Sequence, residues 1–221
     1  MKKQFVVIGL GRFGSSLTRT LIENNHEVLA LDKDINLVEK MATIATHVVQ
    51  GDSTDETVLQ ELGVHHFNHA VVAIGENLQA SILTTLLLKE MGLSKVTAKA
   101  TNATHGKVLM KIGVDQVVYP ERDMGIRLGT QLSSDNLVDY IELSPHYNVV
   151  EMKAPQSMNG RTLAQLDIRA TYGCNILAIK SGESVNISPK AEDVIRTEDI
   201  LLMIGSNKEI RHMEDKYGHK W

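Results

Sequence analysis

The chain has 221 residues, 43% of them apolar, which suffices for one large domain or two small ones with a real hydrophobic core. Its formal net charge of −4 and its lack of a basic stripe argue against a nucleic-acid partner. A single cysteine, Cys174, excludes an internal disulfide framework and fits a reducing cytosol, where a small semi-buried residue is favoured over a reactive thiol.

The chain opens with an apolar run of strand length, residues 5–8, followed directly by a Gly-x-Gly-x-x-Gly turn and by apolar residues at helical spacing. A turn of this kind between a strand and a helix is typical of nucleotide binding. Gly9 allows the tight turn, Gly11 lets phosphate oxygens approach bare backbone, and Gly14 lets the helix pack on the strand. The helix start offers unpaired N–H groups and a partial positive charge to an anion.

A second predicted strand, residues 28–31, ends at Asp32. A carboxylate at this point can accept hydrogen bonds from both ribose hydroxyls of an adenosine, and it repels a 2′-phosphate. The turn, the helix and the acidic residue follow one another at the spacing of a dinucleotide-binding site. They therefore predict an adenine nucleotide site rather than an unliganded α/β turn that uses glycine only for its geometry.

Strand and helix patterns continue to alternate up to residue 120. The apolar stretch at residues 82–88 is interrupted by threonines and is far shorter than the roughly twenty residues of a membrane span. The alternation predicts an α/β fold with a Rossmann-like, doubly wound parallel sheet over residues 1–120. The further expected strands are 47–50, 70–74, 96–100 and 114–119, and the further expected helices are 36–45, 55–62, 77–91 and 105–112.

The character of the sequence changes after residue 120. Residues 121–133 predict a helix with an apolar stripe, and residues 137–141 carry a second stripe. Ser144-Pro145-His146 is typical of a break between segments. We expect residues 121–144 to provide crossover or dimerisation helices and a linker.

Residues 145–221 predict a small α+β subdomain, large enough to fold and especially so if it dimerises. Its expected elements are strands at 147–152, 176–179, 184–187 and 200–204 and helices at 162–166 and 208–217.

The histidines do not suggest an enzyme. His65, His66 and His69 precede the strand at 70–74, away from the strand carboxyl ends where ligands bind in such sheets. They have no cysteine or carboxylate at metal-ligand spacing, so a solvated loop is favoured. His105 opens a helix, where a capping or surface role is the safer interpretation. No nucleophile–base pair is evident, and the chain is therefore interpreted as a nucleotide sensor without catalytic activity.

Four segments point to a family: Gly9-Leu10-Gly11-Arg12-Phe13-Gly14, Gly51-Asp52-Ser53, Ala73-Ile74-Gly75 and Tyr119-Pro120-Glu121-Arg122-Asp123-Met124. With them the whole chain resembles the regulatory subunits of Ktr-type bacterial potassium uptake systems, the RCK or KTN proteins. The resemblance implies an RCK N-terminal domain and an RCK_C subdomain. It also implies dimers that assemble into an octameric ring beneath a membrane-embedded potassium channel subunit, at the inner, cytoplasmic face of the cell membrane.

The resemblance further implies that ATP favours the conducting state and ADP the inactive one. Asp52 and Ser53 would meet the adenine edge, although an ordinary Asx-turn explains Asp52 equally well. Arg12 would reach the terminal phosphates, or else be a solvated surface residue. Glu121 would help to bind a divalent cation, Mg²⁺ or Ca²⁺, near the γ-phosphate, or else interact with the helix dipole. The implied nucleotide-binding residues are Gly9, Gly11, Arg12, Phe13, Gly14, Asp32, Lys33, Asp52, Ser53, Ile74, Gly75, Lys99 and Glu121.

Residues 167–176, followed by Ser188-Pro189, resemble the family's cyclic di-AMP site, where the ligand inhibits transport. Arg169 would meet phosphate and Asn175 a polar edge, while Ile168, Ile176 and Pro189 would cover adenine. Without the resemblance, an apolar dimer seam with one exposed arginine would be preferred.

Sequence does not separate ATP from NAD, because both present an adenosine and a pyrophosphate. Related subunits of Trk-type systems also resemble this chain and respond to NAD(H). The alternative function is therefore an NAD(H)-binding redox sensor or an NAD-dependent oxidoreductase.

Overall fold

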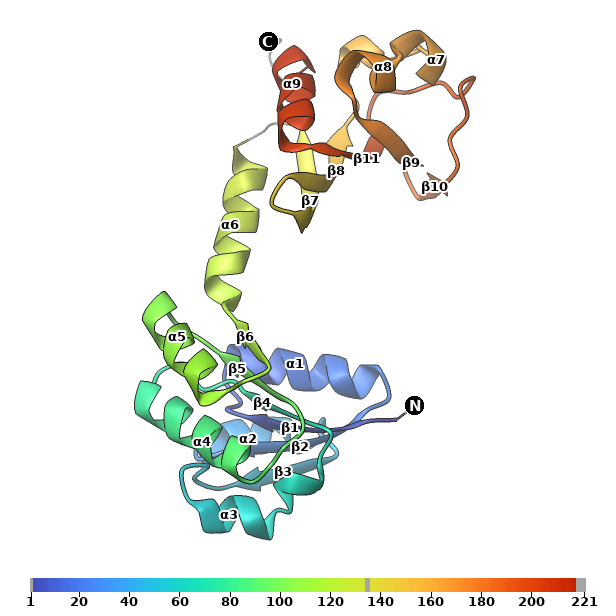
Figure 1. Ribbon diagram of the computed structural model, residues 1–221. Coiled ribbons are helices and arrows are strands. Elements are labelled where there is room, and N and C mark those ends of the chain that lie inside the picture. The colour runs from blue at the N-terminus through green and yellow to red at the C-terminus, as the bar shows by residue number, and fades with distance from the viewer. Residues whose placement is uncertain (1, 134–135, 218–221) are drawn as a thin grey trace. The chain divides into compact units, whose positions relative to one another are not determined.

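The computed structural model describes residues 2–133 and 136–217, and the chain divides into two compact units, Met1–Arg122 and Asp123–Trp221 (Figure 1). Among these described residues, no helix combines the length and the apolar character needed to cross a bilayer.

The first unit is a parallel sheet whose described strands have the order β3-β2-β1-β4-β5-β6. The order reverses between β1 and β4, which both pair with parallel neighbours. The strands are β1 (Gln4–Ile8), β2 (Glu27–Asp32), β3 (His47–Gln50), β4 (His69–Val72), β5 (Val96–Lys99) and β6 (Gln116–Val118). The helices are α1 (Arg12–Glu23), α2 (Ile35–Met41), α3 (Glu56–Glu61), α4 (Leu78–Glu90) and α5 (Ala103–Ile112), with a 3₁₀ turn η1 (Val64–His66).

Helices cover both faces of this sheet, because successive β1 residues point to opposite sides. Val7 belongs to the core layer under α1 and α2, whereas Val6 and Ile8 belong to the layer under α3, α4 and α5. Strands buried on both faces explain the nearly continuous apolar runs of the sequence. The predicted doubly wound α/β sheet is confirmed.

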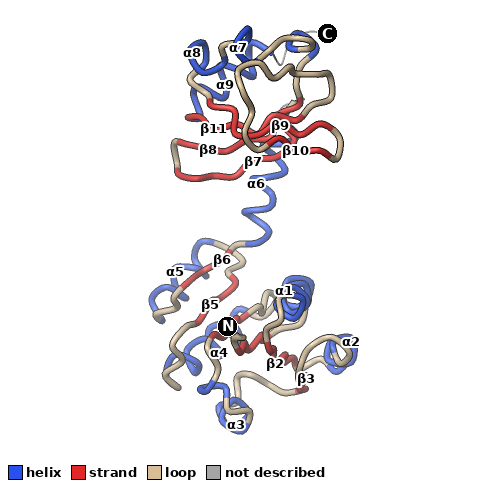
Figure 2. Tube along the Cα trace, turned by 90° about the vertical axis from the view of Figure 1, so that its right-hand side faces the viewer, coloured by secondary structure: helices blue, strands red, loops and turns tan. Residues whose placement is uncertain are grey.

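The second unit is an antiparallel sheet with the strand order β10-β9-β11-β8-β7. Its strands are β7 (Leu137–Ser144), β8 (Tyr147–Lys153), β9 (Asn175–Ser181), β10 (Ser184–Asn186) and β11 (Ile200–Ser206). Its helices are α7 (Leu163–Leu166), α8 (Ile168–Tyr172) and α9 (Asn207–Tyr217), with a 3₁₀ turn η2 (Gln156–Met158). Figure 2 shows these helices on one side of the sheet, where Met152, Met203 and Ile195 are buried. The predicted small α+β part is confirmed.

Helix α6 (Pro120–Leu132) carries the apolar stripe expected at residues 121–133. Met124, Leu128 and Leu132 are all exposed, and no residue of this helix is buried in the chain. The stripe is therefore available to a partner.

Further helices and a linker were expected within residues 121–144, and for the segment after α6 this expectation is wrong. Residues 137–144 form strand β7, which pairs antiparallel with β8. Ser144-Pro145-His146 is the turn of this hairpin, where the Ser144 hydroxyl oxygen accepts from the Tyr147 N–H at 3.2 Å. Serine and proline favour a turn of any kind, so this local signal could not separate a hairpin from a linker. The sequence also did not predict α8, a helix of one to two turns.

Strand β7 is expected to be necessary for the second unit. A fragment of residues 123–221 should melt cooperatively in circular dichroism. A fragment of residues 146–221 should be less stable by about 2 kcal/mol or more, because Leu137 and Tyr140 pack on its core and β7 covers the edge of β8. Equal melting temperatures for the two fragments would contradict this expectation.

Candidate functional site

The candidate site lies at the carboxyl ends of the central strands of the first unit. Ligands of doubly wound sheets bind where the strand order reverses, which is here between β1 and β4. The loops after β1, β2, β4 and β5 meet at this edge, and the predicted nucleotide-binding residues come from these loops, from the loop after β3 and from the start of α6.

The three glycines of the first loop have separate roles. Gly9 has a φ of +95°, and a Cβ there would lie 3.0 Å from backbone atoms of Ala73 and Ile74. A Cβ on Gly14 would lie 1.8 Å from the Gly9 carbonyl oxygen, so only glycine allows α1 to pack this closely on β1. No atom lies within 4 Å of a Cβ built on Gly11, which leaves its backbone open to a ligand.

The start of α1 is suited to an anion. Its N-cap, Gly11, provides no side-chain cap, and its first turn contains no acidic residue. The first helical hydrogen bond at this end runs from the Ser15 N–H to the Gly11 carbonyl at 2.9 Å. The N–H groups of Arg12, Phe13 and Gly14 precede it and have no partner within the helix, as a phosphate site requires.

Asp32 ends β2 beside this loop and has a role that the sequence did not reveal. The Leu10 N–H donates to Asp32 Oδ2 at 2.6 Å, and the Asp34 N–H donates to Asp32 Oδ1 at 2.9 Å. The carboxylate therefore holds the glycine loop to the end of β2. A carboxylate has about four acceptor positions, so ribose hydroxyls can still bind to it.

The phosphate side of the site is a cavity of about 560 Å³ lined by residues from several loops. It brings together most of the residues predicted for this side: Gly11, Arg12, Phe13, Asp32, Lys33, Ile74, Gly75, Lys99 and Glu121.

Two side chains form an ion pair in this cavity. Lys99 Nζ lies 2.5 Å from Glu121 Oε1, and the side chains are 11% and 65% exposed, respectively. The hydrogen bond from Lys99 lowers the pKa of the Glu121 carboxyl, and the charge of Arg12 acts in the same direction. The cavity wall thus carries charges of both signs, with the cations Arg12, Lys33 and Lys99 beside the carboxylates of Asp32, Asp34, Glu76 and Glu121.

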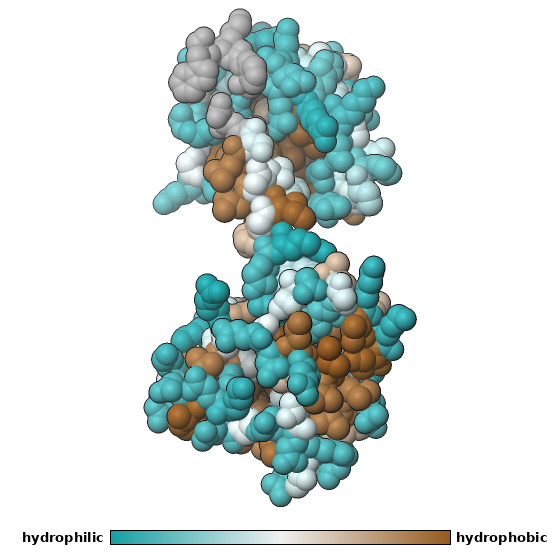
Figure 3. Space-filling model, turned by 90° about the vertical axis from the view of Figure 1, so that its left-hand side faces the viewer, coloured by the Kyte–Doolittle hydropathy of each residue, from teal (hydrophilic) through white to brown (hydrophobic). Residues whose placement is uncertain are grey.

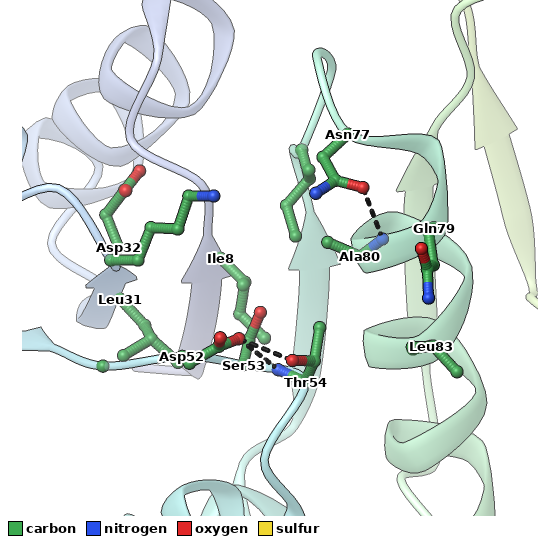
Figure 4. A pocket seen from close by; sticks show the side chains of 13 residues that line it. Ile8, Leu31, Asp32, Asp52, Ser53, Thr54, Asn77, Gln79, Ala80 and Leu83 are labelled. Carbon is green, nitrogen blue, oxygen red and sulfur yellow. Dashed lines mark hydrogen bonds between the residues drawn. The ribbon is translucent and has the colours of Figure 1, made fainter.

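A cavity of about 300 Å³ adjoins the ends of β1 to β4 and suits an adenine (Figure 4). Its apolar lining comes from Ile8, Leu31, Ile74 and Leu83. Asp52 forms the Asx-turn that was one of its two interpretations, with the Thr54 N–H donating to Asp52 Oδ1 at 2.9 Å. The pKa of Asp52 is lowered mainly by this bond.

Some residues that line this cavity were predicted from the sequence, and others were not. Ser53 was identified, but it is buried and its hydroxyl shares a 2.8 Å hydrogen bond with Thr84. Asn77 caps α4 by accepting from the Ala80 N–H at 2.9 Å, and it also lines the cavity (Figure 4). Gln79 and Leu83 of α4 line it as well. Their position directly after the carboxyl end of β4 was the signal available for them.

A divalent cation fits this site only together with a nucleotide. In the part of the chain that the structure describes, no group of three His, Cys, Asp or Glu side chains could hold a metal ion. Glu121, Asp34 and Glu76 bring exposed carboxylates to the cavity, and one or two carboxylates plus phosphate oxygens are a common ligand set for Mg²⁺.

The residues predicted for cyclic di-AMP lie in the second unit and differ in exposure. Arg169 and Asn175 are exposed, and Ile176 and Pro189 are half-buried. Ile168 is buried in the core beside Tyr172, so little of it is available to a ligand. This burial could not be anticipated, because α8 was not predicted.

Two other side chains with reactive chemistry, His105 and Cys174, are buried in the fold. Burial lowers the pKa of His105, which packs at the start of α5 and near Thr101. The Cys174 thiol is 0% exposed, and burial raises its pKa to about 11, so it is inert rather than reactive.

Residues 5–120 match the TrkA-N domain family and residues 149–218 match the TrkA-C domain family. The chain is 53% identical over 219 residues to the Ktr system potassium uptake protein C of Bacillus subtilis (strain 168), with 99% of each chain covered. It is 45% identical over 214 residues to the Ktr system potassium uptake protein A of the same organism, covering 97% of this chain and 96% of that protein. The RCK domain of GsuK shares the fold, with a TM-score of 0.71 at 20% identity over 100% of this chain and 49% of that one.

The glycine loop yields a paired prediction. Gly14→Ala should destabilise the protein by about 1–3 kcal/mol, because its methyl group would overlap the Gly9 carbonyl. Gly11→Ala should leave the melting temperature close to that of the wild type, since its φ is −62° and its surroundings are open, while blocking the approach of phosphate. Thermal melts test the first statement, and nucleotide titrations of Gly11→Ala test the second. A stable Gly14→Ala variant, or full nucleotide affinity in Gly11→Ala, would contradict the assignment.

Proposed function

This chain belongs to the family of Ktr-type potassium uptake regulatory subunits, and we propose that it senses adenine nucleotides for a membrane-embedded potassium channel subunit. The observation that carries the proposal is the pair of adjoining cavities at the reversal of strand order, one partly lined by apolar side chains and one that contains the cations Arg12, Lys33 and Lys99. Its relatives are named as potassium uptake proteins and not as enzymes, which agrees with the expected regulator. The proposed position of the chain is the inner face of the cell membrane, through its partner.

In this proposal ATP favours the conducting state and ADP the inactive one. The two nucleotides differ by one phosphoryl group, and a ligand shifts an equilibrium only through its different affinity for two states. The discriminating groups must therefore contact the terminal phosphate. Arg12 and Lys99 are the cations of the cavity wall that best fit this task, and Glu121 contributes through a divalent cation bound to the phosphates.

We propose that copies of the chain associate through their exposed apolar surfaces, as dimers and then as an octameric ring. Leu78, Leu83 and Leu86 are exposed on α4, a helix that is apolar on most of its circumference. Figure 3 looks onto the side of the first unit that carries α4 and α5, where apolar side chains gather. The stripe of α6 is a second such surface. Another copy of the chain carries the same apolar surfaces and therefore suits each of them as a partner.

We propose a second ligand, cyclic di-AMP, at the surface of the second unit between two copies. Arg169 is an exposed cation close in sequence to Asn175, and next to Pro189 the Lys190 N–H donates to Asp193 Oδ2 at 2.7 Å. A two-fold ligand suits a groove between two identical subunits.

The nucleotide proposal is tested by a thermal-shift panel of ATP, ADP, NAD, NADH and cyclic di-AMP, because a bound ligand raises stability by mass action. ATP and ADP should both stabilise the wild type. Arg12→Ala should weaken ATP binding by about tenfold or more and ADP binding much less, since it removes a charged hydrogen bond to the terminal phosphate. Arg19→Ala removes an exposed arginine of the same helix and should change neither. Stabilisation by NAD or NADH but not by ATP would replace this proposal with the NAD(H) sensor.

The cyclic di-AMP proposal is tested by calorimetry on the full chain. One ligand should bind per dimer, and Arg169→Ala should weaken the binding and reduce its dependence on salt, because an exposed cation contacts phosphate. Arg196→Ala removes another exposed arginine of the second unit and should have no effect. Absence of binding to the wild type, or equal losses in both variants, would remove this site.

A further inference from the structure

The ion pair between Lys99 and Glu121 joins two very different environments. Lys99 is the last residue of β5, and its side chain is almost completely withdrawn from water. Glu121 is in the first turn of α6 and is largely exposed. A buried ammonium needs a counter-charge much more than an exposed carboxylate does, so the pair matters mainly to Lys99.

The space around the Lys99 ammonium is restricted by Gly75. A Cβ at position 75 would lie 3.3 Å from Lys99 Nζ, so this glycine provides room for the ammonium at the cavity wall. The same cavity is lined by Arg12 and Lys33 and by the carboxylates of Asp32, Asp34 and Glu76. Among the described residues, the ion pair of the Lys99 ammonium is with Glu121. Glu121 is therefore the carboxylate that neutralises Lys99 in the ligand-free chain.

A carboxylate that holds a lysine has fewer acceptor positions for a metal ion. A polyphosphate that enters the cavity would offer Lys99 several anionic oxygens, and these can replace Glu121 as its counter-charge. Glu121 would then face the phosphates as an unpaired anion, which is the ligand that a divalent cation between them requires.

We propose that Lys99 is an internal cation that occupies Glu121 in the absence of nucleotide and transfers to the phosphates when nucleotide binds, so that Glu121 accepts a divalent cation only in the nucleotide complex. Lys99 thereby determines the cation dependence of nucleotide binding. This inference rests on the proposed function and specifies how that site is regulated. Nucleotide and cation then bind with positive coupling, and linkage requires the coupling to be equal in both directions.

The first experiment uses the full chain without ligand. Glu121→Gln leaves a buried ammonium without its partner, whereas Lys99→Met leaves an exposed carboxylate in water and retains the aliphatic packing. Glu121→Gln should therefore have the lower melting temperature of the two, and ATP should restore it by supplying phosphate to Lys99. An equal melting temperature in both variants, or no restoration by ATP, would overturn the exchange.

The second experiment measures ATP affinity by calorimetry in EDTA and in Mg²⁺. In EDTA, Lys99→Met should bind ATP about tenfold or more weakly than the wild type, because a charged hydrogen bond is lost. Mg²⁺ should recover most of this loss, so that the ratio of the two affinities is larger than in the wild type. Glu121→Gln should bind ATP in EDTA at least as well as the wild type and should lose the Mg²⁺ effect. Lys111→Met removes an exposed lysine of α5 that lines neither cavity and should leave the Mg²⁺ ratio unchanged.

Two outcomes overturn the inference in different ways. If Lys99→Met lowers ATP affinity by the same factor in EDTA and in Mg²⁺, Lys99 only contacts phosphate. The exchange is then wrong, and the proposed nucleotide sensor stands. If the wild type binds no adenine nucleotide in either condition, the sensor and the exchange fall together. Lys99→Arg retains the charge, and its retention of a wild-type Mg²⁺ ratio would support the electrostatic basis of the exchange.

Discussion

The arrangement of the candidate site depends on the close approach of α1 to β1. The absence of a side chain at Gly14 lets the helix begin directly over the end of the strand, in contact with the Gly9 carbonyl. This contact directs the first N–H groups of α1 to the edge of the sheet where the strand order reverses. Asp32 accepts from the Leu10 N–H, which ties the backbone that would face phosphate to the end of β2. A rigid set of donors lowers the entropic cost of binding.

The charges of the site are close to the start of α6. Its wall brings the cations Arg12, Lys33 and Lys99 to the edge where a nucleotide's phosphates would lie. Glu121 belongs to α6, and the same helix continues through Met124 and Leu128, whose side chains are exposed. A change in the partner of Glu121 therefore acts at the start of a helix that carries an apolar, unpartnered surface. Such an element can couple ligand binding to association, provided that the ligand prefers one of two arrangements.

The sequence was most informative where one local pattern determined one local structure. Strand, glycine turn and helix were predicted correctly around Gly9 to Gly14, because each glycine answers a steric requirement within a few residues. The bond from Leu10 to Asp32 could not be predicted, since it joins residues brought together only by the pairing of β1 with β2.

Local signals with two meanings could not be resolved from the sequence. Residues 137–141 have apolar side chains that suit a helix stripe as well as a strand, and their pairing with β8 decided the outcome. Asp52 had an Asx-turn and a ligand contact as alternatives, and the turn is present in the structure while ligand contact stays a prediction. For Ile168 the resemblance implies a ligand contact; the fold of α8 buries its side chain in the core, and the contact itself stays a prediction.

The environment of Cys174 has a practical consequence for spectroscopy. The chain contains one cysteine, and its thiol is enclosed in the core of the second unit with a strongly raised pKa. Maleimide and similar labels react with exposed thiolates, so they should not label Cys174 in the folded protein. A cysteine introduced on any exposed surface would be the sole reactive one. Fluorophores or spin labels could thus report on each unit separately in a chain whose native cysteine remains in place.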